Sequence, residues 1–111
     1  MRYKIVLVPF PFDNFSATKV RPAVCLTEKI GKYEHIVIAF ITSQIPADKH
    51  ETDIVLEKDE VTGLKIDSYL RLHKLTTIPY DLIKRQLGQV QSLKKVEIQN
   101  KLSQLFGLKT K

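Results

Sequence analysis

The chain has 111 residues, a hydrophobic share of 43% and a formal net charge of +6. This length and composition predict one globular domain over residues 1–111 and exclude a fibrous or disordered chain. A single cysteine, Cys25, excludes an internal disulfide framework. The apolar run that ends at Pro9 is too short to cross a membrane. We therefore expect a cytoplasmic protein without a membrane contact.

The positive charge is unevenly distributed along the chain. From residue 84 onward, seven basic side chains face one carboxylate, Glu97, and they account for the whole net charge. Residues 33–67 carry eight carboxylates against three lysines. If these segments fold on opposite sides, the protein has a basic face that suits a polyanion. The alternative is solvated surface charge that keeps the protein soluble.

Strands are predicted where apolar and β-branched residues gather or alternate with polar ones. Five such stretches are residues 3–10, 21–27, 35–42, 53–57 and 69–75, and residues 87–91 predict a short sixth strand. Residues 35–42 are apolar on both faces, so we expect them at the centre of the sheet. In residues 69–75, Leu70 and Leu72 point to the core, while Arg71 and His73 share the opposite face.

Helices are predicted late in the chain. Pro79 opens a possible short helix that ends near Gln86. Ser92 is a candidate N-cap and Gly107 a candidate stop for a final helix. Its apolar stripe consists of Ile98, Leu102, Leu105 and Phe106. Short strands followed by a helix predict a mainly β fold, with a strongly bent antiparallel sheet or barrel.

The sequence gives no sign of a metal or cofactor site. His35, His50 and His73 lack the spacing of paired ligands, and no second cysteine exists. The four glycines are scattered, so no phosphate-binding loop is present. We expect no metal and no cofactor. Cys25 lies within a predicted strand, where a buried and inert thiol is the natural interpretation.

Two positions at strand ends are candidates for chemistry. Arg21 begins the second predicted strand, just before Pro22. An arginine there either binds a ligand or makes an ion pair at the strand edge, for example with Asp13. Thr42 and Ser43 end the central strand, where side chains emerge from the core. Their hydroxyl groups either contact a ligand or cap a turn.

Three segments together resemble the MazF/PemK family of toxins. The first joins Val6-Leu7-Val8-Pro9-Phe10-Pro11-Phe12, a short loop, and Val20-Arg21-Pro22-Ala23-Val24. The second is Ala39-Phe40-Ile41-Thr42-Ser43-Gln44, where a strand ends in a hydroxyl residue. The third runs from Asp67 to Ile78. The order and spacing of these segments match over nearly the whole chain.

The resemblance implies an SH3-like β-barrel with a C-terminal helix, assembled as a homodimer. It implies a toxin of a type II toxin–antitoxin system that cuts single-stranded RNA at short motifs. A cognate antitoxin would occupy the RNA groove, and DNA would be contacted only through that complex. Carried over, Arg21 and Thr42 are catalytic. The possible auxiliary residues are His73, Arg71, Ser43 and Asp13, and the expected RNA contacts are Lys19, Arg21, Ser16, Thr76 and Thr77.

The chain departs from the family pattern at two places. Ser16 stands where some members have a glutamate, and Thr76-Thr77-Ile78-Pro79 replaces an Arg-Thr-Ile-Asp-like segment. The general base is therefore not identified, and the preferred RNA motif should differ. His73 either takes part in catalysis or has a structural or dimer-contact role. Two other functions stay open: a non-catalytic RNA- or antitoxin-binding protein, and a CcdB-like gyrase poison, which the basic tail at residues 107–111 disfavours.

Overall fold

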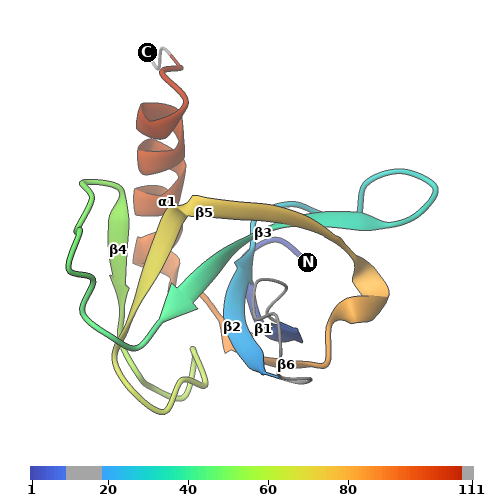
Figure 1. The fold of residues 1–111 in the computed structure, drawn as a ribbon, viewed down its shortest axis with the longest axis horizontal. Coiled ribbons are helices and arrows are strands. Elements are labelled where there is room, and N and C mark those ends of the chain that lie inside the picture. The colour runs from blue at the N-terminus through green and yellow to red at the C-terminus, as the bar shows by residue number, and fades with distance from the viewer. Residues whose placement is uncertain (10–18, 109–111) are drawn as a thin grey trace.

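The fold is a strongly curled antiparallel sheet with one helix at the end of the chain (Figure 1). A computed structural model describes residues 1–9 and 19–108. Within them, the sheet has the strand order β4-β5-β3-β2-β1-β6, so β3 lies inside it, as its two apolar faces predicted. The elements are β1 (Lys4–Pro9), β2 (Val20–Cys25), β3 (His35–Thr42), β4 (Asp53–Leu56), β5 (Ser68–Pro79), the short 3₁₀ helix η1 (Tyr80–Leu82), β6 (Arg85–Gln89) and α1 (Ser92–Leu105).

The curl of the sheet divides the core into two clusters, one on each face. Alternate residues of β3 enter different clusters, because successive side chains of a strand point to opposite faces. Ala39 and Ile41 join the cluster that packs against α1 through Ile98. Ile38 and Phe40 join the cluster closed by Ile83 after η1. Cys25 is fully buried in the second cluster, and burial raises the pKa of its thiol to about 11. The thiol is thus protonated at neutral pH.

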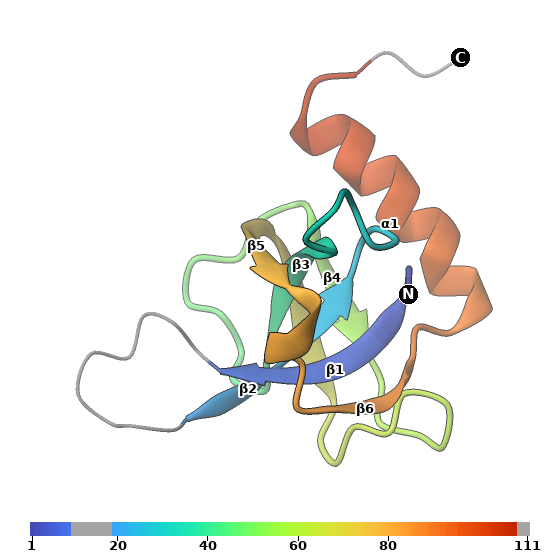
Figure 2. The same cartoon turned by 90° about the vertical axis from the view of Figure 1, so that its right-hand side faces the viewer.

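Helix α1 covers one side of the half-barrel, next to β4 and the N-terminal residues (Figure 2). The side-chain amide of Gln99 donates a hydrogen bond of 2.8 Å to the hydroxyl of Tyr3. The ammonium group of Lys101 donates to the carbonyl oxygen of Asp53 at 3.1 Å. The sheet and the helix thus form one unit. Among the described residues, no helix has the length and apolar character that crossing a bilayer requires.

Several predicted boundaries differ from the observed ones. Strand β5 continues to Pro79 rather than ending near residue 75, because Thr76, Thr77 and Ile78 go on pairing with β3. The helix predicted for residues 79–86 is only the single turn η1, and β6 begins at Arg85 instead of residue 87.

The ends of α1 were predicted with mixed success. Ser92 is not the N-cap: the helix is capped by the extended residue Gln91, with no side-chain hydrogen bond. Gly107 ends the helix as predicted, with a φ of +67° and Leu108 N–H donating to the Ser103 carbonyl at 2.8 Å. This is the geometry of a Schellman ending. Phe106 was wrongly placed in the buried stripe; it follows the last helical residue and is 60% exposed.

A break in strand pairing positions the functional site. Ala39 of β3 pairs with Leu75 of β5, but Ile41 pairs with Leu70. One residue of β3 therefore faces four residues of β5, 71–74, of which Arg71 still pairs with β4. Figure 1 shows β5 bending sharply along its course. Such bulges bend a strand and redirect its side chains. Here the bulge opens a pocket between the end of β3 and β5.

Candidate functional site

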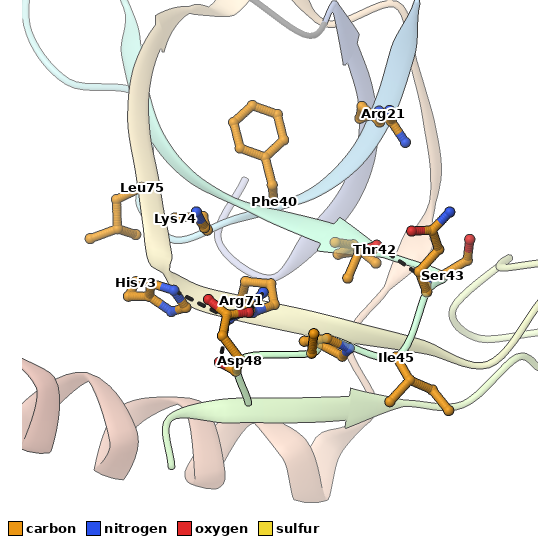
Figure 3. Close-up of a pocket in the computed structure, with 14 residues that line it drawn as sticks. Arg21, Phe40, Thr42, Ser43, Ile45, Asp48, Arg71, His73, Lys74 and Leu75 are labelled. Atoms are coloured by element: carbon orange, nitrogen blue, oxygen red, sulfur yellow. Dashed lines mark hydrogen bonds and ion pairs between the residues drawn. The ribbon is translucent and has the colours of Figure 1, made fainter. Parts of the chain in front are cut away.

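The pocket has a volume of about 870 Å³ and receives side chains from three strands and a loop (Figure 3). Its lining comprises Arg21 of β2, residues 40–42 of β3, residues 43–48 of the loop that follows, and residues 71 and 73–75 of β5. Four expected site residues, Thr42, Ser43, Arg71 and His73, thus line it together with Arg21. A pocket of this size is large enough for part of a polymeric ligand.

Thr42 and Ser43 lie where β3 ends. The hydroxyl oxygen of Thr42 accepts a hydrogen bond of 3.2 Å from the backbone N–H of Gln44. This is the turn-capping role considered above, and it uses one lone pair of the hydroxyl. Because a hydroxyl group carries one proton as well as two lone pairs, Thr42 can still donate to a ligand. Ser43 is exposed at the rim of the same pocket.

Arg21 reaches the pocket from β2. It pairs with Val8 of β1 and is half-buried, while the neighbouring residues Ala23 and Val24 are fully buried. Figure 3 shows Arg21 and Thr42 on one side of the pocket, apart from Asp48, Arg71 and His73 on the other. We call these the Arg21–Thr42 side and the Arg71–His73 side. A guanidinium group offers several N–H donors in a planar fork, which matches the oxygens of a phosphate.

The donors of Arg71 are used by carboxylates. Its Nε donates to Oδ1 of Asp53 at 2.9 Å, and its two Nη atoms donate to Oδ1 of Asp48 at 3.3 Å. The side chains of Arg71 and Asp53 are only 10% and 7% exposed. Arg71 was predicted to point away from the core, and it does line the pocket, but it is the centre of a buried ion-pair network.

His73 completes this network. Nη2 of Arg71 lies 3.4 Å from Nε2 of His73, and because arginine can only donate, Nε2 must be the acceptor. The proton of the neutral ring is then on Nδ1, 3.9 Å from Oδ1 of Asp53. Desolvation and the charge of Arg71 lower the pKa of His73 below its usual value of 6.5. The imidazole is therefore neutral at physiological pH.

Three other predicted residues, Lys19, Thr76 and Thr77, are not part of the pocket lining. Lys19 is exposed just before β2, and Thr76 and Thr77 pair with Ile38 and Val37 beyond the bulge, with none of the three in the lining. Asp13 and Ser16 lie outside the described residues. Over residues 1–9 and 19–108, no three His, Cys, Asp or Glu side chains gather in a way that would hold a metal ion.

Asp48 and Asp53 are the functional residues that sequence reasoning missed. Asp53 pairs directly with Arg71 across β4 and β5. Opposite charges on facing residues of adjacent strands stabilise a sheet, so the correct register would have revealed this pair. Asp48 lies in the loop after β3, where no periodic pattern indicates its partner.

Comparison with known proteins identifies the class to which this fold and pocket belong. The model of the family described as PemK-like, MazF-like toxin of type II toxin–antitoxin system matches residues 1–106. The chain therefore belongs to this toxin family. No curated protein matches it in sequence.

Solved structures of MazF-type proteins have the same fold. A Mycobacterium tuberculosis toxin, MazF-mt6, is similar with a TM-score of 0.76 and 20% identity, over 96% of this chain and 99% of the other. An endoribonuclease from a mycobacterial species, in complex with its cognate antitoxin, has a TM-score of 0.75 and 14% identity, over 100% and 98%. MazE–MazF from Deinococcus radiodurans has a TM-score of 0.70 and 16% identity, over 97% and 95%. The expected MazF-type fold is confirmed.

Proposed function

We propose that this toxin is an endoribonuclease that cuts single-stranded RNA at short sequence motifs without a metal ion. The observation that carries the proposal is the joint presence of Arg21 and Thr42 in one pocket at the end of β3. Support also comes from the family, and from similar structures described as endoribonucleases.

The proposed reaction is an attack by the ribose 2′-hydroxyl on the adjacent phosphorus. A bond forms between the 2′-oxygen and phosphorus, and the bond to the 5′-oxygen breaks, which leaves a 2′,3′-cyclic phosphate and a 5′-hydroxyl. The pentacovalent intermediate carries extra negative charge on its oxygens, and preorganised donors can stabilise that charge. Arg21 supplies a fixed positive charge for this purpose, and the Thr42 hydroxyl donates to the same phosphate.

The reaction also needs an acceptor for the 2′-hydroxyl proton. His73 is neutral, but its Nε2 lone pair accepts from Arg71, so we assign it to holding the pocket wall. We assign the acceptor to Asp13, which is the only carboxylate in residues 10–18, the segment leading to Lys19 and Arg21. On this assignment, Asp13→Asn slows cleavage by about 10²- to 10⁴-fold. An unchanged rate would remove Asp13 from the mechanism.

We also propose a homodimer in the cytoplasm that is neutralised by a cognate antitoxin, with DNA contacted only through that complex. Similar structures with antitoxin bound support the partner. Leu93 and Val96 of α1, 87% and 58% exposed, are apolar surface that a protein partner would cover. Light scattering of the purified toxin should give twice the monomer mass. A monomer at micromolar concentration would contradict the dimer.

The test of the function is incubation of purified protein with a long mixed-sequence RNA in EDTA. We expect discrete cuts that leave 2′,3′-cyclic phosphate ends, and no cuts with Arg21→Ala. RNA that is bound but stays intact would favour the non-catalytic alternative. Inhibition of gyrase supercoiling would favour the gyrase poison. Either result, without cleavage, would overturn the proposal.

A further inference from the structure

A row of side chains crosses three strands at the Thr42 end of the pocket. Thr42 of β3 pairs with Tyr69 of β5, and Tyr69 pairs with Val55 of β4. Directly paired residues of neighbouring strands have their side chains on the same face. The adjacent residues on these strands belong to the core that packs against α1, namely Ile41, Leu70 and Ile54. Thr42, Tyr69 and Val55 therefore share the face that points away from that core.

The middle of this row carries an aromatic ring and a cation. The ammonium group of Lys49, an exposed residue, lies 5.9 Å from the centroid of the Tyr69 ring. Tyr69 is half-buried, and Val55 next to it is 44% exposed. Strands in a sheet lie about 5 Å apart, so the side chain of Tyr69 begins within one strand spacing of Thr42. An aromatic side chain thus adjoins the proposed catalytic hydroxyl, and an aliphatic and a cationic side chain lie next to that aromatic ring.

These three side chains have the chemistry that binds an unpaired nucleobase. Aromatic rings stack on bases, an aliphatic side chain can cover a base edge, and a lysine can neutralise the neighbouring phosphate. We propose that Tyr69, flanked by Val55 and Lys49, is a stacking subsite for one unpaired base of single-stranded RNA, next to the phosphate held by Arg21 and Thr42. The choice of RNA as ligand rests on the proposed function. This subsite would help to determine which motif is cut.

A second aromatic surface has carboxylates beside its rings and provides a control. Tyr33 and Tyr80 line a separate pocket of about 410 Å³ with two carboxylates, Glu34 and Asp81. It lies at the His35 end of β3, a distance of roughly 23 Å along the strand from Thr42. Carboxylates repel phosphates. Of the two lysines over these rings, Lys29 lies 3.8 Å from the Tyr80 ring centroid and 3.9 Å from Glu34 Oε2, and Lys32 lies 5.8 Å from the Tyr33 ring centroid.

The test measures RNA binding separately from cleavage. Fluorescence anisotropy with 2′-O-methyl oligonucleotides, which lack the attacking hydroxyl, gives the affinity of wild type and variants. Because stacking on one aromatic ring contributes strongly, Tyr69→Leu should bind about 10- to 100-fold more weakly. Tyr69→Phe keeps the ring and should bind like wild type, as should the matched control Tyr33→Leu. Lys49→Gln should reduce the slope of log affinity against log salt concentration by somewhat less than one, the contribution of one lost phosphate contact.

A second measurement uses the wild-type protein and does not depend on how the variants fold. 2-Aminopurine is placed in turn at each position of the oligonucleotide, and its fluorescence is quenched where it stacks on an aromatic ring. We expect quenching at one position when the protein binds. The proposed stacking subsite would be overturned if folded Tyr69→Leu bound the oligonucleotide as tightly as wild type. It would also be overturned if the fluorescence were the same at all positions of the oligonucleotide. Binding and quenching without cleavage would overturn only the proposed endoribonuclease activity.

Discussion

The two sides of the pocket each contain an arginine, with different neighbouring side chains. Each presents an arginine to the cavity, Arg21 from β2 and Arg71 from β5. On the Arg71–His73 side, the guanidinium bonds to two carboxylates and a histidine. On the Arg21–Thr42 side, a half-buried arginine accompanies a hydroxyl that can still donate. The residue type of Arg71 therefore does not determine its role; its carboxylate partners do.

This difference suggests that the two sides of the pocket have different roles, one structural and one in binding the ligand. An arginine already held by a buried carboxylate, here Asp53, cannot turn to a phosphate without leaving that carboxylate uncompensated, which is costly. We infer that the Arg71–His73 side fixes the shape of β5 at its bulge, while the Arg21–Thr42 side contacts the reacting phosphate. The predictions below test this division, from the largest expected effect to the smallest.

Among variants of residues that line the pocket, the largest effect on cleavage is expected from Arg21→Ala. Loss of one charge-stabilising donor typically lowers a rate by about 10²- to 10³-fold. The melting temperature should change little, because Arg21 is only half-buried and lies near the start of β2, away from its fully buried residues. Cleavage rates and thermal melts of the same preparation check both statements. Full activity in Arg21→Ala would place the chemistry elsewhere.

Asp53→Ala should have its largest effect on stability. Removing one partner of a buried ion pair leaves the other charge uncompensated, at a cost of about 3 kcal/mol. Chemical denaturation measures that loss for Asp53→Ala. Asp48→Ala is the matched control, since the Asp48 side chain is 77% exposed and its loss should cost far less. Equal stability of the two variants would show that burial does not distinguish the two carboxylates.

Thr42 is expected to contribute one hydrogen bond to the reaction. Thr42→Val removes the hydroxyl at nearly constant shape and should slow cleavage by roughly tenfold, as expected for one neutral hydrogen bond. Thr42→Ser keeps the hydroxyl and should retain most activity. Single-turnover rates on a fixed RNA compare the three proteins. If Thr42→Val cut as fast as wild type and Thr42→Ser were slow, the methyl group of Thr42, rather than its hydroxyl, would matter.

The smallest effect is a pH dependence of stability that comes from His73. Desolvation and Arg71 lower its pKa in the folded state, so the unfolded chain takes up the proton first as pH falls. Stability is thus fully present above about pH 6.5, the unfolded value, and declines as pH drops through the folded pKa. His73→Gln should flatten the slope of unfolding free energy below pH 6.5. If the slope were the same in wild type and His73→Gln, this pH dependence of stability would not come from His73.

The sequence predicted the framework better than the site. Two apolar faces were enough to place β3 inside the sheet, and alternation was enough to put Leu70 and Leu72 in the core. Both signals are local. The bulge opposite Phe40 is not local, since it is a mismatch of register between β3 and β5. The partners of Arg71 are likewise 18 and 23 residues away, so its ion pairs became visible only with the fold.

The roles of Arg21 and Thr42 also could not be decided from the sequence alone. Their residue types and their places at strand ends were compatible with either ligand binding or simple capping. The structure brings them to one pocket, although they come from different strands. It also shows that capping and ligand binding are compatible for Thr42, because the bond to Gln44 leaves its proton available.

The most direct test of the division between the two sides compares Arg21→Lys with Arg71→Lys. Lysine keeps the charge but loses the planar fork of donors. Cleavage of one RNA and thermal unfolding are measured for both variants and for wild type. We expect Arg21→Lys to melt like wild type and cut slowly, and Arg71→Lys to melt at a lower temperature and cut normally while folded. The reverse pattern, with slow cutting by a stable Arg71→Lys and normal cutting by Arg21→Lys, would contradict the account.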